Sequence, residues 1–185
     1  MRWLSGTARP IFAAMNPAVL RIWLRAWLTI AVVDGLFATT YPVVAYGQPL
    51  GRVWKGVASV LLGPRAMQGG PRTILFGLGM HLCVALTWTT VFLILALMSP
   101  RLRRIVASPA GILGVAALYG PSIWIIMSFL VIRTLTGRPP TINDRWWIQL
   151  FAHIPFVALP IVATIGRGLR AAEGLLPARP VGEPA

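Results

Sequence analysis

Three titratable side chains stand inside long apolar stretches of this sequence: Asp34, His81 and His153. Histidine titrates near neutral pH and a carboxylate can hold an imidazolium, so such a set can relay protons. Two imidazoles and one carboxylate can also bind a transition metal, and two facing histidines in a helical bundle can be axial haem ligands. Polar side chains buried between helices also hydrogen-bond their neighbours and fix the packing, which is the role we take as the default.

The depth of these residues decides whether they can meet. His81 lies eight residues after Thr73 and His153 seven residues after Trp146, and both apolar stretches start on the same side of an alternating bundle. At about 1.5 Å per helical residue the two imidazoles lie at nearly the same depth, and Asp34 lies about 6 Å deeper. A carboxylate inside a span should face the interior of the bundle. The predicted polar core also includes two aromatic residues of the third stretch: Tyr119 and Trp124.

The composition indicates that apolar surroundings replace most of the water around this chain. Of 185 residues, 57% are hydrophobic and 11% are charged, whereas globular domains average about 25% charged residues. The 17 Lys and Arg residues face 4 Asp and Glu, but they lie between long uncharged runs instead of forming the basic face that nucleic acid needs. The single cysteine, Cys83, excludes an internal disulfide framework and a cysteine zinc cluster.

Four stretches are long and apolar enough for transmembrane helices, which need about 20 residues to cross about 30 Å of hydrocarbon. The sequence therefore predicts an all-α integral membrane protein with four transmembrane helices. They lie within a membrane domain of residues 21–168 and cover about residues 22–46, 73–98, 105–132 and 146–166.

The segment between the first and second spans has a different pattern. Apolar residues recur at helical spacing over about residues 50–63, but Arg52 and Lys55 interrupt them, so the uncharged run is too short to cross. We predict an amphipathic helix that lies in the membrane interface. Residues 1–20 lack a signal-peptide pattern and are expected to form a cytoplasmic or interfacial segment. Residues 169–185 are expected to be a mobile tail.

The basic residues between the spans indicate the orientation. Ten Lys and Arg residues flank the side that carries both termini, and seven flank the opposite side. The positive-inside rule then favours cytoplasmic termini. The expected partners are the lipid bilayer and anionic lipid headgroups, which the loop arginines can contact, and not nucleic acid. A homo-oligomer is an alternative to the monomer, because four short spans enclose little volume and a pore would need several copies.

Small residues predict where the spans pack. Lipid tails are as apolar as leucine, so close backbone contact and interhelical hydrogen bonds must bring spanning helices together. In the second span a glycine shares a face with His81, and in the third span glycines follow alanines at four-residue steps. The predicted packing positions are Gly77, Gly111, Gly114 and Gly120.

No catalytic site emerges from the sequence. Thr39, Thr40 and Ser128 have no adjacent base at a recognisable spacing, and Ser or Thr within a span commonly bonds its own helix backbone. We therefore predict a protein that is not an enzyme, without an assigned metal or cofactor. The alternative class is a transport or cofactor protein that uses the three titratable residues of the polar core.

One set of residues between Asp34 and Gly168 carries a resemblance to a known family. Through this set, which covers nearly three quarters of the chain, the sequence resembles the YagU-type group of small bacterial inner-membrane proteins, whose domain has no known function. Ser128 stands where an asparagine is expected in that group, and Arg133-Thr134-Leu135 replaces a proline-leucine ending. The set consists of Asp34 in the first span; Val57-Ala58-Ser59-Val60-Leu61-Leu62-Gly63, Ala66 and Gly69-Gly70 in the interfacial segment; Gly77 and His81-Leu82 in the second span; Tyr119-Gly120, Trp124 and Met127 in the third; and His153 with Leu159-Pro160-Ile161 in the fourth.

The resemblance implies a multi-pass, non-enzymatic protein of the bacterial inner membrane, with the association with acid tolerance that is proposed for the family at large. With the buried polar residues it predicts a membrane protein whose Asp/His core is structural by default and linked to proton or acid response. The alternatives are a small transporter or channel subunit and a metal- or haem-binding membrane protein, each using the same residues.

Overall fold

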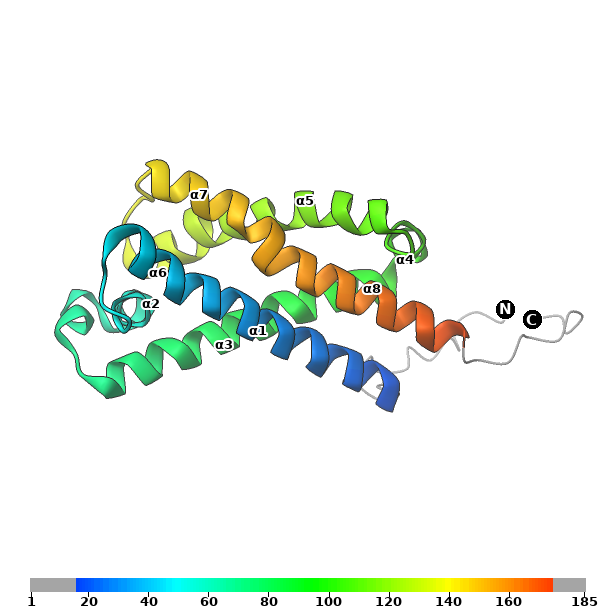
Figure 1. Ribbon diagram of the computed structural model, residues 1–185, viewed down its shortest axis with the longest axis horizontal. Coiled ribbons are helices and arrows are strands. Elements are labelled where there is room, and N and C mark those ends of the chain that lie inside the picture. Colours follow the sequence, from blue (N-terminus) through cyan, green and yellow to red (C-terminus); the bar gives the residue numbers. More distant parts are fainter. Residues whose placement is uncertain (1–15, 175–185) are drawn as a thin grey trace, which may run out of the picture.

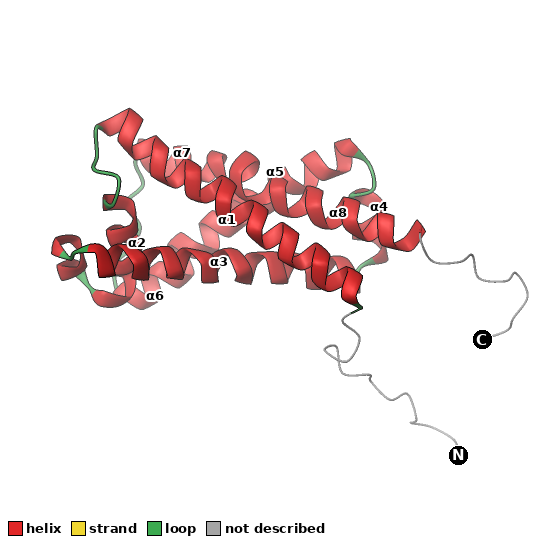
Figure 2. Cartoon of the chain, turned by 60° about the horizontal axis from the view of Figure 1, so that its bottom comes forward, coloured by secondary structure: helices red, strands yellow, loops and turns green. Residues whose placement is uncertain are grey.

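The computed structural model describes residues 16–174, and all regular elements in this range are helices. Four helices are long and apolar enough to cross a membrane, which confirms the predicted all-helical class with four candidate spans. They run side by side along the molecule (Figure 1), and short loops join them at its two ends (Figure 2). The spans are α1 (Pro17–Tyr46); α3 (Pro71–Met98); α5 (Pro109–Ile126) with η3 (Met127–Ile132) and α6 (Arg133–Thr136); and α7 (Asp144–His153) with η4 (Ile154–Ala158) and α8 (Leu159–Gly174). The connecting helices are α2 (Arg52–Leu62), η2 (Pro64–Gln68) and α4 (Pro100–Ile105).

Prolines and side-chain caps explain where the spans begin. The Ser108 Oγ accepts a hydrogen bond from the Gly111 N–H at 3.0 Å, and the Asn143 Oδ1 accepts one from the Trp146 N–H at 3.1 Å. Each bond satisfies one of the N–H groups that lack a partner in the first turn of a helix. Three of the four spans also carry a proline in their first turn, where its missing N–H breaks no helical bond: Pro17, Pro71 and Pro109.

The predicted third span, residues 105–132, contains a turn that the prediction missed. The short helix α4 ends at residue 105, and the chain turns before Ser108 caps a new helix. The same Ser-Pro signal starts α4, where the Ser99 Oγ accepts a bond from the Leu102 N–H at 3.1 Å. The long apolar helix therefore covers Pro109–Thr136 instead.

The fourth helix is longer than the predicted residues 146–166. It begins at Asp144 and continues to Gly174, so residues 169–174 of the predicted mobile tail are helical, and Leu169 is buried. Residues 1–15 and 175–185, which hold most of the predicted N-terminal segment and tail, lie outside the described residues.

The helix α2 covers most of the predicted segment 50–63 and packs against α3. It buries Trp54 and Ala58. A Cβ atom at Gly77 would collide with the Trp54 carbonyl oxygen, so only glycine lets the two backbones touch at this point.

The glycines of the third span fall into two groups. A Cβ atom at Gly120 would lie 2.6 Å from the His153 carbonyl oxygen, and one at Gly111 would collide with the Ile105 carbonyl oxygen. Gly114 is exposed and would have no atom within 4 Å of its Cβ. The prediction that Gly114 packs against a neighbour is therefore wrong for the described residues, because its face of α5 points outward.

Aromatic donors on one helix bond to oxygen atoms on another. The Trp23 indole donates to the Thr90 Oγ1 at 2.9 Å, and the Trp27 indole donates to the Leu82 carbonyl oxygen at 3.0 Å. Both bonds tie α1 to α3. Such bonds hold helices together where burial of apolar surface does not.

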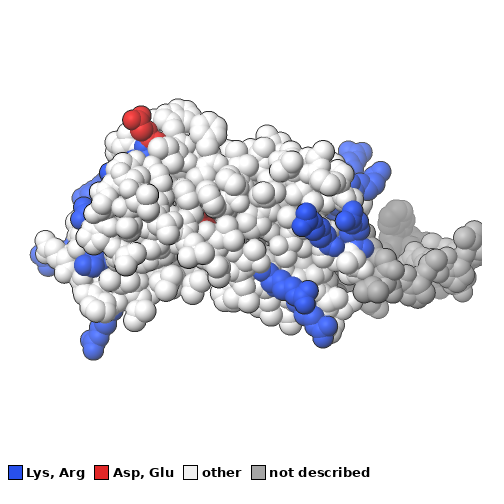
Figure 3. Space-filling model, viewed as in Figure 1, with Lys and Arg blue, Asp and Glu red and all other residues white. Residues whose placement is uncertain are grey.

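The outer surface is apolar in its middle and basic toward its ends. Leu28, Val32 and Leu36 follow each other at four-residue steps on α1 and are 54%, 58% and 61% exposed. In Figure 3, Lys and Arg gather toward the two ends, and one small acidic spot interrupts the uncharged band between them. A large exposed apolar surface of this kind marks contact with a membrane or another protein.

Two alanine substitutions on the third span test its packing. We expect Gly120→Ala to lower the free energy of unfolding by about 1–3 kcal/mol, because the added methyl group meets rigid backbone. Gly114→Ala should leave it unchanged or raise it by up to about 1 kcal/mol, because alanine is the better helix former. Unfolding of both variants in detergent, followed by circular dichroism, measures the difference. An equal loss of unfolding free energy in both variants would contradict the assignment of Gly120 to a packed position and of Gly114 to an open one.

Candidate functional site

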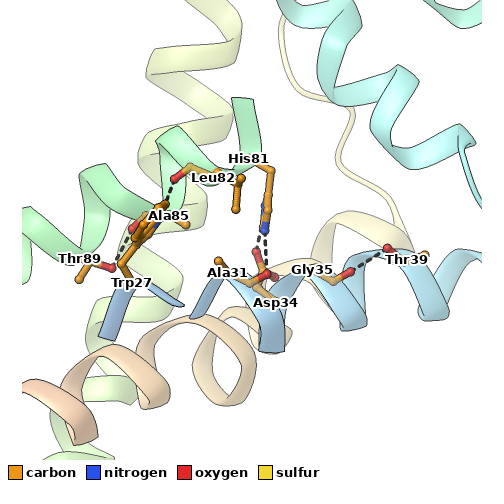
Figure 4. Close-up of polar contacts among 9 residues, drawn as sticks. All are labelled: Trp27, Ala31, Asp34, Gly35, Thr39, His81, Leu82, Ala85 and Thr89. Atoms are coloured by element: carbon orange, nitrogen blue, oxygen red, sulfur yellow. Dashed lines mark hydrogen bonds and ion pairs between the residues drawn. The ribbon is translucent and has the colours of Figure 1, made fainter. Parts of the chain in front are cut away.

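The structure brings Asp34 on α1 and His81 on α3 together. The Asp34 Oδ2 lies 3.7 Å from the His81 Nδ1. A dashed line marks the contact between the two side chains in Figure 4. The side chains are 22% and 10% exposed, respectively. The contact is longer than a hydrogen bond, and the two groups attract each other through charge when both are ionised.

The oxygen atoms around His81 indicate which of its ring nitrogens carries a hydrogen. Its Nε2 lies 3.3 Å from the Ala31 carbonyl oxygen, and a carbonyl only accepts hydrogen bonds, so Nε2 carries a hydrogen. Its Nδ1 faces the Asp34 carboxyl group. When Nδ1 and the carboxyl group hold one proton between them, the pair is either an imidazolium with a carboxylate or a neutral imidazole with a carboxylic acid. Both forms have zero net charge and hold the same number of protons.

One face of α1 receives the His81 ring. Ala31, Asp34 and Gly35 are three and four residues apart, which places them on the same face. A Cβ atom at Gly35 would lie 3.5 Å from the His81 Nε2, an ordinary van der Waals contact, so the ring lies close to α1 at this point. On its other side His81 meets Trp54 of α2, with ring centroids 5.2 Å apart.

The third titratable residue, His153, lies near this pair without joining it in a direct contact. Its Nδ1 lies 2.6 Å from the Gln149 carbonyl oxygen of its own helix, so Nδ1 donates. In the neutral ring Nε2 is then an acceptor. His153 lies within range of the Asp34 charge, and both residues line one cavity.

A partly open cavity of about 480 Å³ lies between the helices around Asp34. Its walls come from α1, α2, α3, α7 and the third span, and they are mostly aliphatic. The lining contains no Lys or Arg, and its polar and aromatic residues are Asp34, His81, Gln149, His153, Trp54, Trp88 and Trp124.

Trp124 carries an unused hydrogen-bond donor in the cavity wall. Its Nε1 is buried and has no partner among the described residues. Its ring centroid lies 5.0 Å from that of His153. A buried donor without an acceptor costs about 1–3 kcal/mol.

Tyr119 does not join the polar core that the sequence analysis predicted. Its hydroxyl donates to the Trp88 carbonyl oxygen at 2.7 Å, which ties α5 to α3. The ring packs against Phe92, with centroids 5.2 Å apart. Tyr119 does not line the cavity, because its helix face turns it toward α3.

Trp54 is a cavity residue that the sequence analysis did not select. It comes from α2, which was assigned to the membrane interface and not to the site. The available signal was its four-residue spacing from Ala58, since both residues lie on the buried face of α2.

The metal and haem alternatives find little support in this geometry. Within residues 16–174 no group of three His, Cys, Asp or Glu side chains is placed to hold a metal ion. An axial haem ligand needs a ring nitrogen that faces the iron, but both nitrogens of His81 face oxygen atoms of Asp34 and Ala31.

Comparison of the chain with protein-family models, with curated proteins and with solved structures finds no match. The function must therefore be argued from the site itself.

Two tryptophan substitutions test whether the Trp124 donor is unused. Trp146→Phe removes the donor of the 3.3 Å bond to the buried Ser128 Oγ. Trp124→Phe removes the same ring atoms and no described bond. We expect Trp146→Phe to lower the free energy of unfolding by about 1–3 kcal/mol more than Trp124→Phe, as measured by denaturant titration in detergent. An equal or larger loss for Trp124→Phe would mean that its N–H already has an acceptor.

Proposed function

We propose that this chain is a four-span protein of a bacterial inner membrane whose Asp34–His81 pair binds and releases protons. The observation that carries the proposal is the 3.7 Å contact between a carboxylate and an imidazole, both within apolar helices. An intramembrane ionisable residue marks a functional site by default, since it is costly to keep there. The resemblance to the YagU-type group and its link to acid response belong to this proposal.

The distribution of charge supports insertion into a membrane. The uncharged band of Figure 3 lies between two groups of basic residues, as expected when hydrocarbon surrounds the middle and headgroups surround the ends. α1 begins and α8 ends at the same end of the bundle (Figure 1), which we assign to the cytoplasm. At the opposite end, Arg52 and Lys55 on α2 are suited to anionic headgroups, so α2 lies in the interface.

The described contacts of both histidines argue for proton binding and against nucleophilic catalysis. Neither imidazole hydrogen-bonds a hydroxyl or thiol group among the described residues, because His81 contacts Ala31 and Asp34 while His153 contacts Gln149. A nucleophile needs an adjacent base. The proposal therefore assigns no catalytic activity to this chain.

The single cysteine tests insertion. Cys83 is exposed and lies near the middle of α3, so in open membrane fragments a membrane-impermeant maleimide should label it far more slowly than in SDS, by at least about tenfold. The lipid excludes both the reagent and the thiolate form that reacts with it. Mass spectrometry measures the fraction of the chain that carries the label.

The matched control moves the cysteine to the end of the same helix. In a Cys83→Ala background, Arg72→Cys introduces a thiol at an exposed position of the first turn of α3, and it should label at similar rates in membranes and in SDS. Rapid labelling of Cys83 in membranes would contradict insertion of α3.

The proton site is tested by nuclear magnetic resonance, because the chain has 2 histidines. With 15N-labelled histidine in lipid bilayers, the pH dependence of the His81 signal should differ between the native chain and Asp34→Asn, because the substitution removes the carboxyl group that lies 3.7 Å from the imidazole.

Two variants control this experiment. Asp144→Asn neutralises the exposed carboxylate at the start of α7 and should leave the His81 titration unchanged. Asp34→Glu keeps the charge and should retain most of the native behaviour. Identical His81 titrations in the native chain and in folded Asp34→Asn would refute the proposed proton site.

A further inference from the structure

The cavity beside the Asp34–His81 pair has the size of a ligand site. Its volume of about 480 Å³ falls in the range of about 300–1,000 Å³ that is usual for small-molecule sites. Such sites combine mostly apolar walls with a few polar groups, as this lining does. The question is which class of ligand suits these walls.

The charge of the lining selects a cation. Asp34 is the one carboxylate of the cavity wall, and neither Lys nor Arg lines it. The Asp34 carboxylate would repel an anionic ligand, and no Lys or Arg side chain lines the cavity to offset that repulsion. The rings of Trp54, Trp88 and Trp124 line the same cavity, and aromatic faces attract cations, most strongly where water is excluded.

We propose that the cavity binds a lipophilic organic cation, a substituted ammonium with an apolar body, in exchange for one proton of the Asp34–His81 pair. This inference rests on the proton site proposed above and names the ligand class of that site.

The exchange follows from counting charges. With its shared proton the pair is neutral, so a bound cation would leave a net charge of +1 between apolar helices. Burying an uncompensated charge is costly. When the proton leaves the pair for the solvent, the site holds a carboxylate, a neutral imidazole and the cation, and its net charge returns to zero.

One other titratable group faces this site. The described lining contributes Asp34 from α1, His81 from α3 and His153 from α7, whereas α2, α5, η3 and α6 contribute none. Lys55 of α2 does not line the cavity. The proton released on binding therefore comes from the pair or from His153, and Asp34→Asn distinguishes the two sources.

Calorimetry on the purified full chain in lipid nanodiscs tests the proposal. The probe is benzyltrimethylammonium, and its control is neopentylbenzene, which has the same shape and no charge. Empty nanodiscs give the background of each. We expect the ammonium to bind at least tenfold more tightly than the neutral compound. Asp34→Asn should weaken ammonium binding at least tenfold and leave binding of the neutral compound unchanged.

Proton exchange is measured in the same experiment. Binding enthalpies in buffers with different ionisation enthalpies should give close to one proton released per cation, and none in Asp34→Asn. Binding of the cation without proton release, equal binding of both compounds, or native affinity in Asp34→Asn would each overturn the proposal.

A second variant keeps the test independent of the charge and separates the two proposals. Val57 of α2 lines the cavity, and Val57→Phe should lower the ammonium affinity at least tenfold while the pH dependence of His81 remains native. If His81 titrates as proposed and no cation binds, this inference fails alone. If the His81 titration is the same in the native chain and in folded Asp34→Asn, the proposal of the proton site fails as well.

Discussion

Close approach of helix backbones is the constraint on which this structure depends. In apolar surroundings, a helical bundle gains little free energy by moving apolar side chains from its outside to its inside. Its helices must therefore be held together by close packing and hydrogen bonds, which act only at short distances. Gly77 and Gly120 permit such contacts because any Cβ atom there would meet the backbone of α2 or of the fourth span. The contact at Gly77 also fixes the wall of the cavity, since it seats Trp54 over His81.

A row of polar contacts between α1 and α3 sets the position of Asp34. Trp23, Trp27 and Ala31 follow at four-residue steps on α1, and each contributes one interaction with α3, to Thr90, Leu82 and His81, respectively. Asp34 is the next residue on that side, so the same register that satisfies the two indoles places the carboxylate beside the imidazole. Packing and the proposed chemistry therefore share one interface, and the structural role of the polar core does not compete with the role in proton binding that we propose for it.

Hydropathy was sufficient to predict the four long helices, but it could not set all their ends. The third helix starts at Pro109 because Ser108 caps it, a local signal that an uncharged run of residues hides. The predicted depths, with Asp34 about 6 Å from the level of the two imidazoles, made a meeting of Asp34 with a histidine foreseeable. The depth of a residue does not give the rotation of its helix about the helix axis. The predictions for Tyr119 and Gly114 therefore failed, because Tyr119 faces α3 and Gly114 faces outward. The spacing of Trp54 and Ala58 marks the buried face of α2, but the place of Trp54 in the cavity wall depends on how α2 docks onto α3.

The π-helical turn η4 has a consequence for how His153 is aimed. In such a turn the chain accommodates one more residue than an α-helix would, and here the turn includes Pro155, which cannot donate a backbone hydrogen bond. An α-helix advances by about 100° per residue. The single extra residue therefore changes the rotation of α7 about the helix axis relative to α8. The direction in which His153 points relative to α8 therefore depends on the wide turn that follows it.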